Sequence, residues 1–274
     1  MLDREDYVEP ACALCGKPGE EPALKPVPRD RILQKMREYE DRSDWNGAER
    51  HLKYWLEEAK AGRDGRGQLM LNNELMGFYR KQGKRKEAEE HRAAALELIE
   101  KLGMEETVTA GTTWVNAATV HEAFGDEAGA LVLFRKAREN YEKNLPPEDE
   151  RLGGLYNNMG LALASAGRYG EAEELFGRAI AVMEKQEHGE NEQAITWLNL
   201  ADVFSAALSP EEAEAKVNDC LERAEALLDA ESLPRDGYHA FVCDKCAPVF
   251  GYYGWFMTEK KLETRAAGIR ADRA

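Results

Sequence analysis

Two cysteine pairs with metal-ligand spacing are the residues of this chain best suited to chemistry. Cys12 and Cys15 lie near the N-terminus of the 274-residue sequence, and Cys243 and Cys246 lie near its C-terminus. Four thiolates are the ligand set of a closed, tetrahedral zinc site. The two pairs stand much further apart than in ordinary zinc fingers, so the match is one of ligand number. We predict one structural zinc bound by all four cysteines, which requires the N-terminal arm to reach the last helices.

His239 gives an alternative ligand set. His239, Cys243 and Cys246 are spaced at i, i+4 and i+7, which places them on one face of a helix. Three protein ligands with an open fourth position are the arrangement of a catalytic zinc, so a zinc-dependent hydrolase is one alternative. Separate or redox roles for the two pairs are a second. A third is that Cys243 and Cys246 are small core residues, because free cysteine is among the most buried residue types.

Other catalytic patterns are missing from the sequence. Its five histidines are scattered, no serine or cysteine stands in a recognisable nucleophile turn, and no glycine-rich phosphate loop follows a strand-like segment. The sequence therefore favours a protein that is not an enzyme.

An internal repeat sets the elements that must position these residues. Gly83, Gly125 and Gly167 each lie in a short polar turn and follow one another at intervals of 42 residues. A fourth turn has Leu208 at the same position, 41 residues after Gly167. Five residues after each of these four positions comes a small residue, and apolar residues follow it at helical spacing. These small residues are Ala88, Ala130, Ala172 and Ala213. Each unit is predicted to be a helical hairpin that buries its apolar face only by stacking on its neighbours.

The repeat resembles the tetratricopeptide repeat. Its best match is Tyr-Asn-Asn-Met-Gly at 156–160, followed by Gly167, Ala172, Phe176 and Ala179. The long period and the acidic linkers are similar to those of kinesin light chain. The resemblance implies an all-α, right-handed α-solenoid of about six hairpins with an extended, cysteine-containing N-terminal arm. The implied arm spans 1–29 and the solenoid 30–272, with hairpins at about 30–63, 69–103, 111–145, 153–187, 194–229 and 238–272. Pro248 is expected to interrupt the first helix of the last hairpin.

The resemblance also implies a peptide site on the concave face, which the first helices of the hairpins line. In the kinesin light chain type, asparagines of these helices hold the backbone of an extended peptide. An asparagine there can also serve packing between repeats, and both interpretations stay open. Charged candidates for the same face favour a neutral or basic segment over an acidic one. The predicted peptide-binding residues are Asn73, Arg80, Asn116, Glu122, Asn157, Asn158, Asn199 and Asp202.

Composition narrows the class of partner. The chain carries 37 Lys and Arg against 52 Asp and Glu, a net charge of −15, which argues against a nucleic acid partner. We expect no membrane span, no secretory signal and a cytoplasmic location. Together the patterns predict a non-enzymatic, peptide-binding adaptor or regulator with a structural zinc that joins the arm to the last repeat. The alternative is a metal- or redox-responsive protein whose arm gates the groove.

Overall fold

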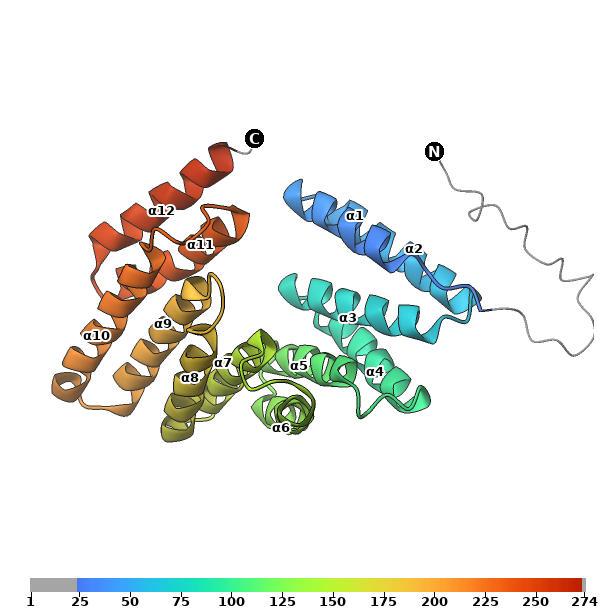
Figure 1. Cartoon of the computed structure of the whole chain (residues 1–274), viewed down its shortest axis with the longest axis horizontal. Helices are drawn as coiled ribbons and strands as arrows, with labels where there is room; N and C mark the ends of the chain where they lie inside the picture. The colour runs from blue at the N-terminus through green and yellow to red at the C-terminus, as the bar shows by residue number, and fades with distance from the viewer. Residues whose placement is uncertain (1–23, 273–274) are drawn as a thin grey trace, which may run out of the picture. The chain divides into compact units, whose positions relative to one another are not determined.

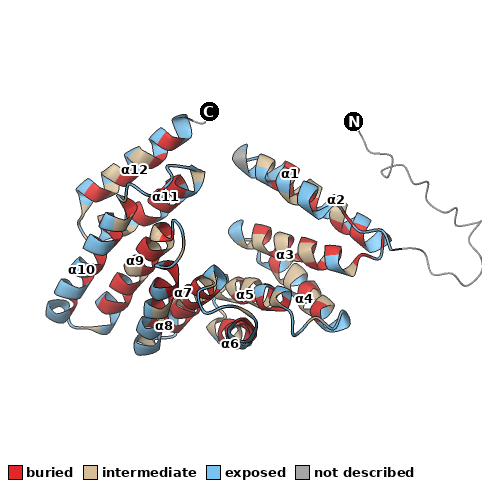
Figure 2. Ribbon diagram, in the orientation of Figure 1, coloured by how far each residue is buried: buried red, intermediate tan, exposed pale blue. Residues whose placement is uncertain are grey.

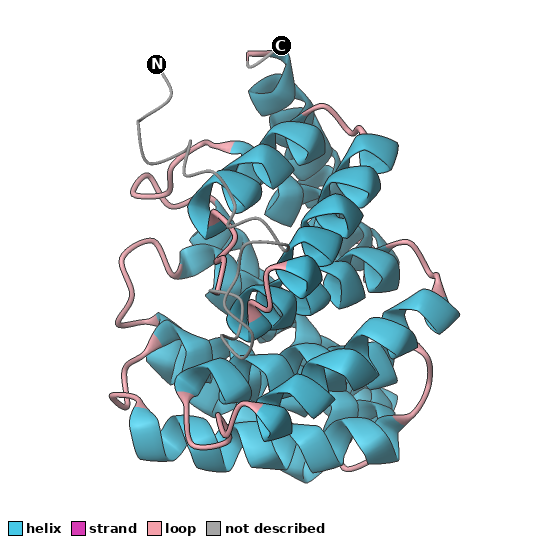
Figure 3. Ribbon diagram, turned by 90° about the vertical axis from the view of Figure 1, so that its right-hand side faces the viewer, coloured by secondary structure: helices cyan, strands magenta, loops and turns pink. Residues whose placement is uncertain are grey.

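The computed structural model describes residues 24–272 of the chain, and this part consists of helices joined by loops, without strands (Figures 1 and 3). The helices are α1 (Arg29–Asp41), α2 (Trp45–Ala61), α3 (Gly65–Lys81), α4 (Arg85–Lys101), α5 (Val108–Ala123), α6 (Glu127–Asn144), α7 (Glu150–Ser165), α8 (Tyr169–Met183), α9 (Glu190–Ala207), α10 (Pro210–Leu228), α11 (Gly237–Tyr252) and α12 (Phe256–Ala271). The predicted all-α repeat fold is confirmed. The predicted boundary between arm and solenoid stays a prediction, because residues 1–23 lie outside the described part.

The chain divides into two compact units between Leu71 and Asn72, within α3. In the first unit, a buried carboxylate fixes the segment that precedes α1. Asp64 accepts hydrogen bonds from the backbone N–H groups of Val27 (2.9 Å) and Gly67 (2.8 Å). Residues 24–28 are thereby held against the turn between α2 and α3.

The second unit contains the hairpins α5/α6, α7/α8, α9/α10 and α11/α12, in each of which the two helices pack against each other. Successive first helices also contact one another, from α5 to α7, α9 and α11. The second helices make their main contacts with first helices, as α6 does with α7 and α8 with α9. In a curved stack of hairpins, the row of helices on the concave side is the shorter one, and its helices lie closer to one another. The first helices form this row, so they line the concave face. Figure 2 shows the buried residues along the packed sides of these helices.

Glycines lie in the turns within the hairpins, at the three predicted positions and also at Gly254. Gly83, Gly125, Gly167 and Gly254 all have positive φ, between 67° and 82°, a backbone conformation that side chains with a Cβ disfavour. The small residues five positions beyond the turns are fully buried at Ala88, Ala130 and Ala172 and 6% exposed at Ala213. The glycine and alanine pattern of the sequence therefore reports real helix-to-helix contacts.

The expected interruption at Pro248 is wrong. Helix α11 runs unbroken from Gly237 to Tyr252 with Pro248 inside it. Proline removes one N–H donor, whose acceptor in a helix is the carbonyl four residues earlier, here that of Asp244. Both residues are exposed, so water is at hand for the carbonyl that loses its partner.

Candidate peptide-binding groove

The residues predicted to bind a peptide all lie in the second unit, on α3, α5, α7 and α9. Among them only Asp202 is exposed, and the others are half-buried, as side chains that line a groove would be. On α9 the residues that reach solvent follow a helical spacing, with Glu192, Ile195, Asn199 and Asp202 along one stripe. We call the corresponding stripes of α5, α7, α9 and α11 the groove face.

Two matching sets of hydrogen bonds, which we call the asparagine ladders, link neighbouring repeats. In the first, Asn116 Nδ2 donates to Asn73 Oδ1 (3.0 Å), and Asn73 Nδ2 donates to Thr113 Oγ1 (3.1 Å). In the second, two repeats further on, Asn199 Nδ2 (2.9 Å) and Thr196 Oγ1 (3.1 Å) both donate to Asn157 Oδ1. Contact between neighbouring repeats is thus part of the role of these asparagines.

The ladders form at α3/α5 and α7/α9 and are missing at α5/α7, where the corresponding positions carry Val115 and Leu155. Asn158, the counterpart of Asn116 and Asn199, makes no hydrogen bond to another side chain within residues 24–272. An asparagine amide offers both a donor and an acceptor. The ladders use only part of that capacity, so amide groups of Asn157 and Asn158 and the Oδ1 atoms of Asn116 and Asn199 can still pair with a ligand.

Two carboxylates on this face, the half-buried Glu122 and the more exposed Asp202, have raised pKa values. Burial raises the pKa of Glu122, although the cations Arg80 on α3 and Lys245 on α11 act in the opposite direction. Burial also raises the pKa of Asp202, which accepts a hydrogen bond from the Tyr253 hydroxyl (2.8 Å). A cationic group placed beside either carboxylate would compensate its lost hydration.

An aromatic stripe on α11 extends the groove face and was missed by the sequence analysis. Tyr238 and Phe241 are 48% and 57% exposed, and their rings stack with centroids 6.3 Å apart. The Tyr238 hydroxyl donates to Glu192 Oε1 on α9 (2.7 Å), which fixes the first ring beside the stripe of α9. With Lys245 the two aromatics repeat at i, i+3 and i+7, a spacing that the sequence already contains.

Comparison with known proteins decides the family. The model of the tetratricopeptide repeat (TPR) matches residues 68–143 and 151–226, more than half of the chain. The chain belongs to the tetratricopeptide repeat family. The TPR fold is also seen in a solved structure from Podosopora anserina, described as putative kinesin light chain nearly identical TPR-like repeats, with 18% identity and a TM-score of 0.53 over 75% of this chain and 96% of that one. BtubC (BKLC) from P. vanneervenii gives 16% identity and a TM-score of 0.51 over 90% and 93%.

At such identities the likeness concerns the TPR fold alone. No curated protein sequence gives a significant match. Within residues 24–272, no helix has the length and apolar character needed to cross a membrane.

Only some of the predicted metal ligands belong to the part of the chain that the TPR structure describes. Cys12 and Cys15 lie outside the described residues. Cys243, Cys246 and His239 are all buried in α11, and the structure brings His239 Nε2 to 3.5 Å from Cys243 Sγ. The His239 ring is already bonded on both sides, to Asn191 Oδ1 (2.9 Å) and to Arg235 Nη1 (2.5 Å). Such partners leave the ring nitrogens of the alternative ligand occupied.

The surroundings of the cysteine pair are apolar and cationic. Burial raises the pKa of Cys246 to about 12 and also raises that of Cys243, despite the nearby Arg265 guanidinium. Zinc binds the thiolate form, so binding would have to overcome this preference for the thiol. Within residues 24–272, no group of three His, Cys, Asp or Glu side chains is arranged to hold a metal ion. The four-cysteine zinc site therefore stays a prediction that depends on the N-terminal pair.

Proposed function

We propose that this TPR protein is a non-enzymatic adaptor or regulator that binds an extended segment of another protein on its groove face. The observation that carries the proposal is the break in the asparagine ladders at α5/α7. There the amide groups of Asn157 and Asn158 stand in the middle of the groove face with hydrogen-bonding capacity to spare.

Asparagine amides suit the backbone of an extended chain, which presents a donor and an acceptor at each residue. The ladder bond fixes the Asn157 side chain through its oxygen and leaves its N–H groups for a ligand. Because the side chain is already held, binding costs less conformational entropy than it would for a freely rotating one. Such contacts read the backbone and leave the choice of sequence to other groups.

The charged groups and exposed aromatic rings of the groove face would select the sequence of the bound segment. Glu122 and Asp202 favour a neutral or basic segment, because an acidic one would add like charge to carboxylates that are already short of water. The exposed rings of Tyr238 and Phe241 would cover one apolar side chain of the segment. The acidic character of the chain also disfavours nucleic acid on this face. A cytoplasmic location, with other intracellular proteins as partners, is part of the proposal.

Two fluorescein-labelled peptides test the function: three repeats of Gly-Ser-Lys-Phe and three repeats of Gly-Ser-Glu-Phe. Anisotropy titrations of the full chain should show at least tenfold tighter binding of the lysine peptide. Asn158→Leu, at a residue that supports no ladder, should weaken it about tenfold, or about 1.4 kcal/mol. Asn218→Leu is the matched control, since Asn218 is an exposed asparagine on the second helix α10, and should change affinity less than twofold.

Equal affinity for the two peptides would contradict the proposed charge preference. Equal effects of the two leucine substitutions would show that the groove face does not bind the segment.

A further inference from the structure

A pocket lies where the second helices α6 and α8 of two neighbouring hairpins meet α7, and we call it the outer pocket. It encloses about 410 Å³ between the end of α6, the start of α7 and the end of α8. This volume is within the range of pockets that hold small ligands or anchoring side chains, about 300 to 1,000 Å³. Its apolar lining consists of Leu145, Pro147, Leu152, Ala181 and Val182.

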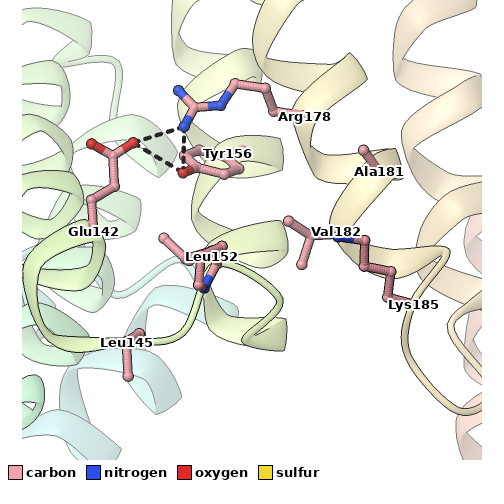
Figure 4. Close-up of a pocket in the computed structure, with 9 residues that line it drawn as sticks. Glu142, Leu145, Leu152, Tyr156, Arg178, Ala181, Val182 and Lys185 are labelled. Atoms are coloured by element: carbon pink, nitrogen blue, oxygen red, sulfur yellow. Dashed lines mark hydrogen bonds and ion pairs between the residues drawn. The ribbon is translucent and has the colours of Figure 1, made fainter.

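Three polar side chains meet at one edge of the outer pocket. Figure 4 shows Glu142 and Arg178 reaching toward the Tyr156 hydroxyl from opposite sides, with Leu145, Leu152 and Val182 beside them. The Tyr156 hydroxyl donates to Glu142 Oε1 (3.0 Å), and Arg178 Nη2 donates to both Glu142 Oε1 (2.9 Å) and the Tyr156 oxygen (2.7 Å). The guanidinium also lies over the Tyr156 ring, 4.2 Å from its centroid. Arg178 is therefore held in one orientation.

Arg178, although held in this way, keeps much of its capacity to donate hydrogen bonds. Only Nη2 of Arg178 is engaged, and its Nε and Nη1 groups have no partner within residues 24–272. Glu142 is already matched by a second cation, because Arg138 Nε donates to the same Oε1 atom (2.8 Å). Lys185 adds a further positive charge to the pocket lining, and its Nζ lies 3.4 Å from Glu148 Oε1. The polar edge thus offers oriented N–H donors and an excess of positive charge.

This arrangement departs from the repeat. One repeat earlier the three positions are Glu100, Trp114 and Lys136, and one repeat later the aromatic position is Trp197. Tryptophan has no hydroxyl to join a carboxylate to a cation. The cluster is therefore a property of this one hairpin interface, and general stacking of repeats does not require it.

We propose that the outer pocket binds a segment of a second protein that presents an apolar side chain next to a carboxylate. The apolar floor would take the side chain, and the free N–H groups of Arg178 would take the carboxylate, a pairing that guanidinium geometry suits. This preference is opposite to the one proposed for the groove face, which would bind a neutral or basic segment. The inference rests on different residues from the proposed function and can hold or fail without it.

Two fluorescein-labelled octapeptides that differ at one position provide the probes: Gly-Ser-Leu-Leu-Glu-Leu-Ser-Gly and the same peptide with Lys in place of Glu. Anisotropy titrations with the full chain should show at least tenfold tighter binding of the glutamate peptide. Arg178→Ala should remove at least nine-tenths of that affinity, and Tyr156→Phe, which keeps the ring and loses the hydroxyl, should remove about half or more. Lys136→Ala changes the corresponding residue one repeat earlier and should alter affinity less than twofold.

Circular dichroism melts of each variant show whether it is still folded. Arg178→Lys provides a second variant, which keeps the positive charge but loses the planar guanidinium with its paired N–H donors. It should bind the glutamate peptide at least threefold more weakly than the natural chain. The proposal is overturned if the lysine peptide binds as well as the glutamate peptide, or if folded Arg178→Ala and Lys136→Ala behave alike. Binding of sodium octanoate that depends on Arg178, with no peptide binding, would also overturn it in favour of a small amphiphilic acid.

Discussion

The close approach of α7 and α8 at Gly160 gives a stability prediction with an internal control. A methyl carbon at Gly160 would lie 2.7 Å from Cε1 of Phe176, a fully buried ring. Carbon atoms pack best at about 3.5 to 4.0 Å, so the ring would have to move by about 1 Å. At Gly154, in the same helix, a methyl carbon would meet no atom within 4 Å.

The two alanine variants should therefore shift stability in opposite directions. Alanine gains about 0.5 to 1 kcal/mol over glycine inside a helix at either position. At Gly160 this gain is set against about 1 to 3 kcal/mol for overfilling a packed core. We expect Gly154→Ala to stabilise the chain, Gly160→Ala to destabilise it, and the two variants to differ by about 1 to 3 kcal/mol.

Thermal unfolding followed by circular dichroism measures the difference. A change of 1 kcal/mol moves Tm by roughly 2 to 4 °C in a domain of this size, so Gly160→Ala should melt at least about 2 °C below Gly154→Ala. If both variants melt above the natural chain by similar amounts, the Phe176 ring has room to move, and the argument that glycine is needed for helix contact at this position fails.

Three further predictions concern the groove face and the cysteines. Asn157→Leu removes the acceptor of two ladder bonds and should lower the free energy of unfolding by about 1 to 2 kcal/mol in urea titrations, whereas an unchanged value would mean that the ladder does not stabilise the stack. The raised pKa values of Glu122 and Asp202 should make affinity for the Gly-Ser-Lys-Phe peptide fall as pH drops through them, because protonation removes the attracting charge; a flat anisotropy profile between about pH 4 and 7 contradicts this. Elemental analysis of protein purified without chelator should find about one zinc per chain, and its loss in Cys243→Ser, while metal-free natural protein would exclude the four-cysteine site.

The fold could be predicted from a few residues because each repeat makes the same helix-to-helix contact. Gly83, Gly125 and Gly167 mark turns that need positive φ, and Ala88, Ala130 and Ala172 mark places where two helices touch. A single such glycine would not identify a fold, but the regular spacing of several made the prediction of helical hairpins specific. Pro248 misled because the rule against proline in helices concerns a lost hydrogen bond, and at an exposed position that loss is small.

The candidate sites could be predicted only in part. The sequence shows that Asn73, Asn116, Asn157 and Asn199 share a repeat position or lie next to it, but not which of them bond to one another. The ladders also include Thr113 and Thr196, whose side chains pair with these asparagines only once the helices lie side by side.

The outer pocket was missed for a related reason. Glu142, Tyr156 and Arg178 come from three helices, and the tyrosine stands where the repeat simply calls for an aromatic residue. Comparing each repeat position by position, and asking where a residue departs from its counterparts, is the signal that could have found it.

Helix α7 carries the two proposed sites on consecutive residues. Tyr156 contributes to the outer pocket and Asn157 to the groove face, and neighbouring residues of a helix point about 100° apart around its axis. A change in the orientation of α7 about its own axis would therefore move both side chains at once. A ligand that produced such a change at one site would alter binding at the other, and linkage would make the effect equal in both directions.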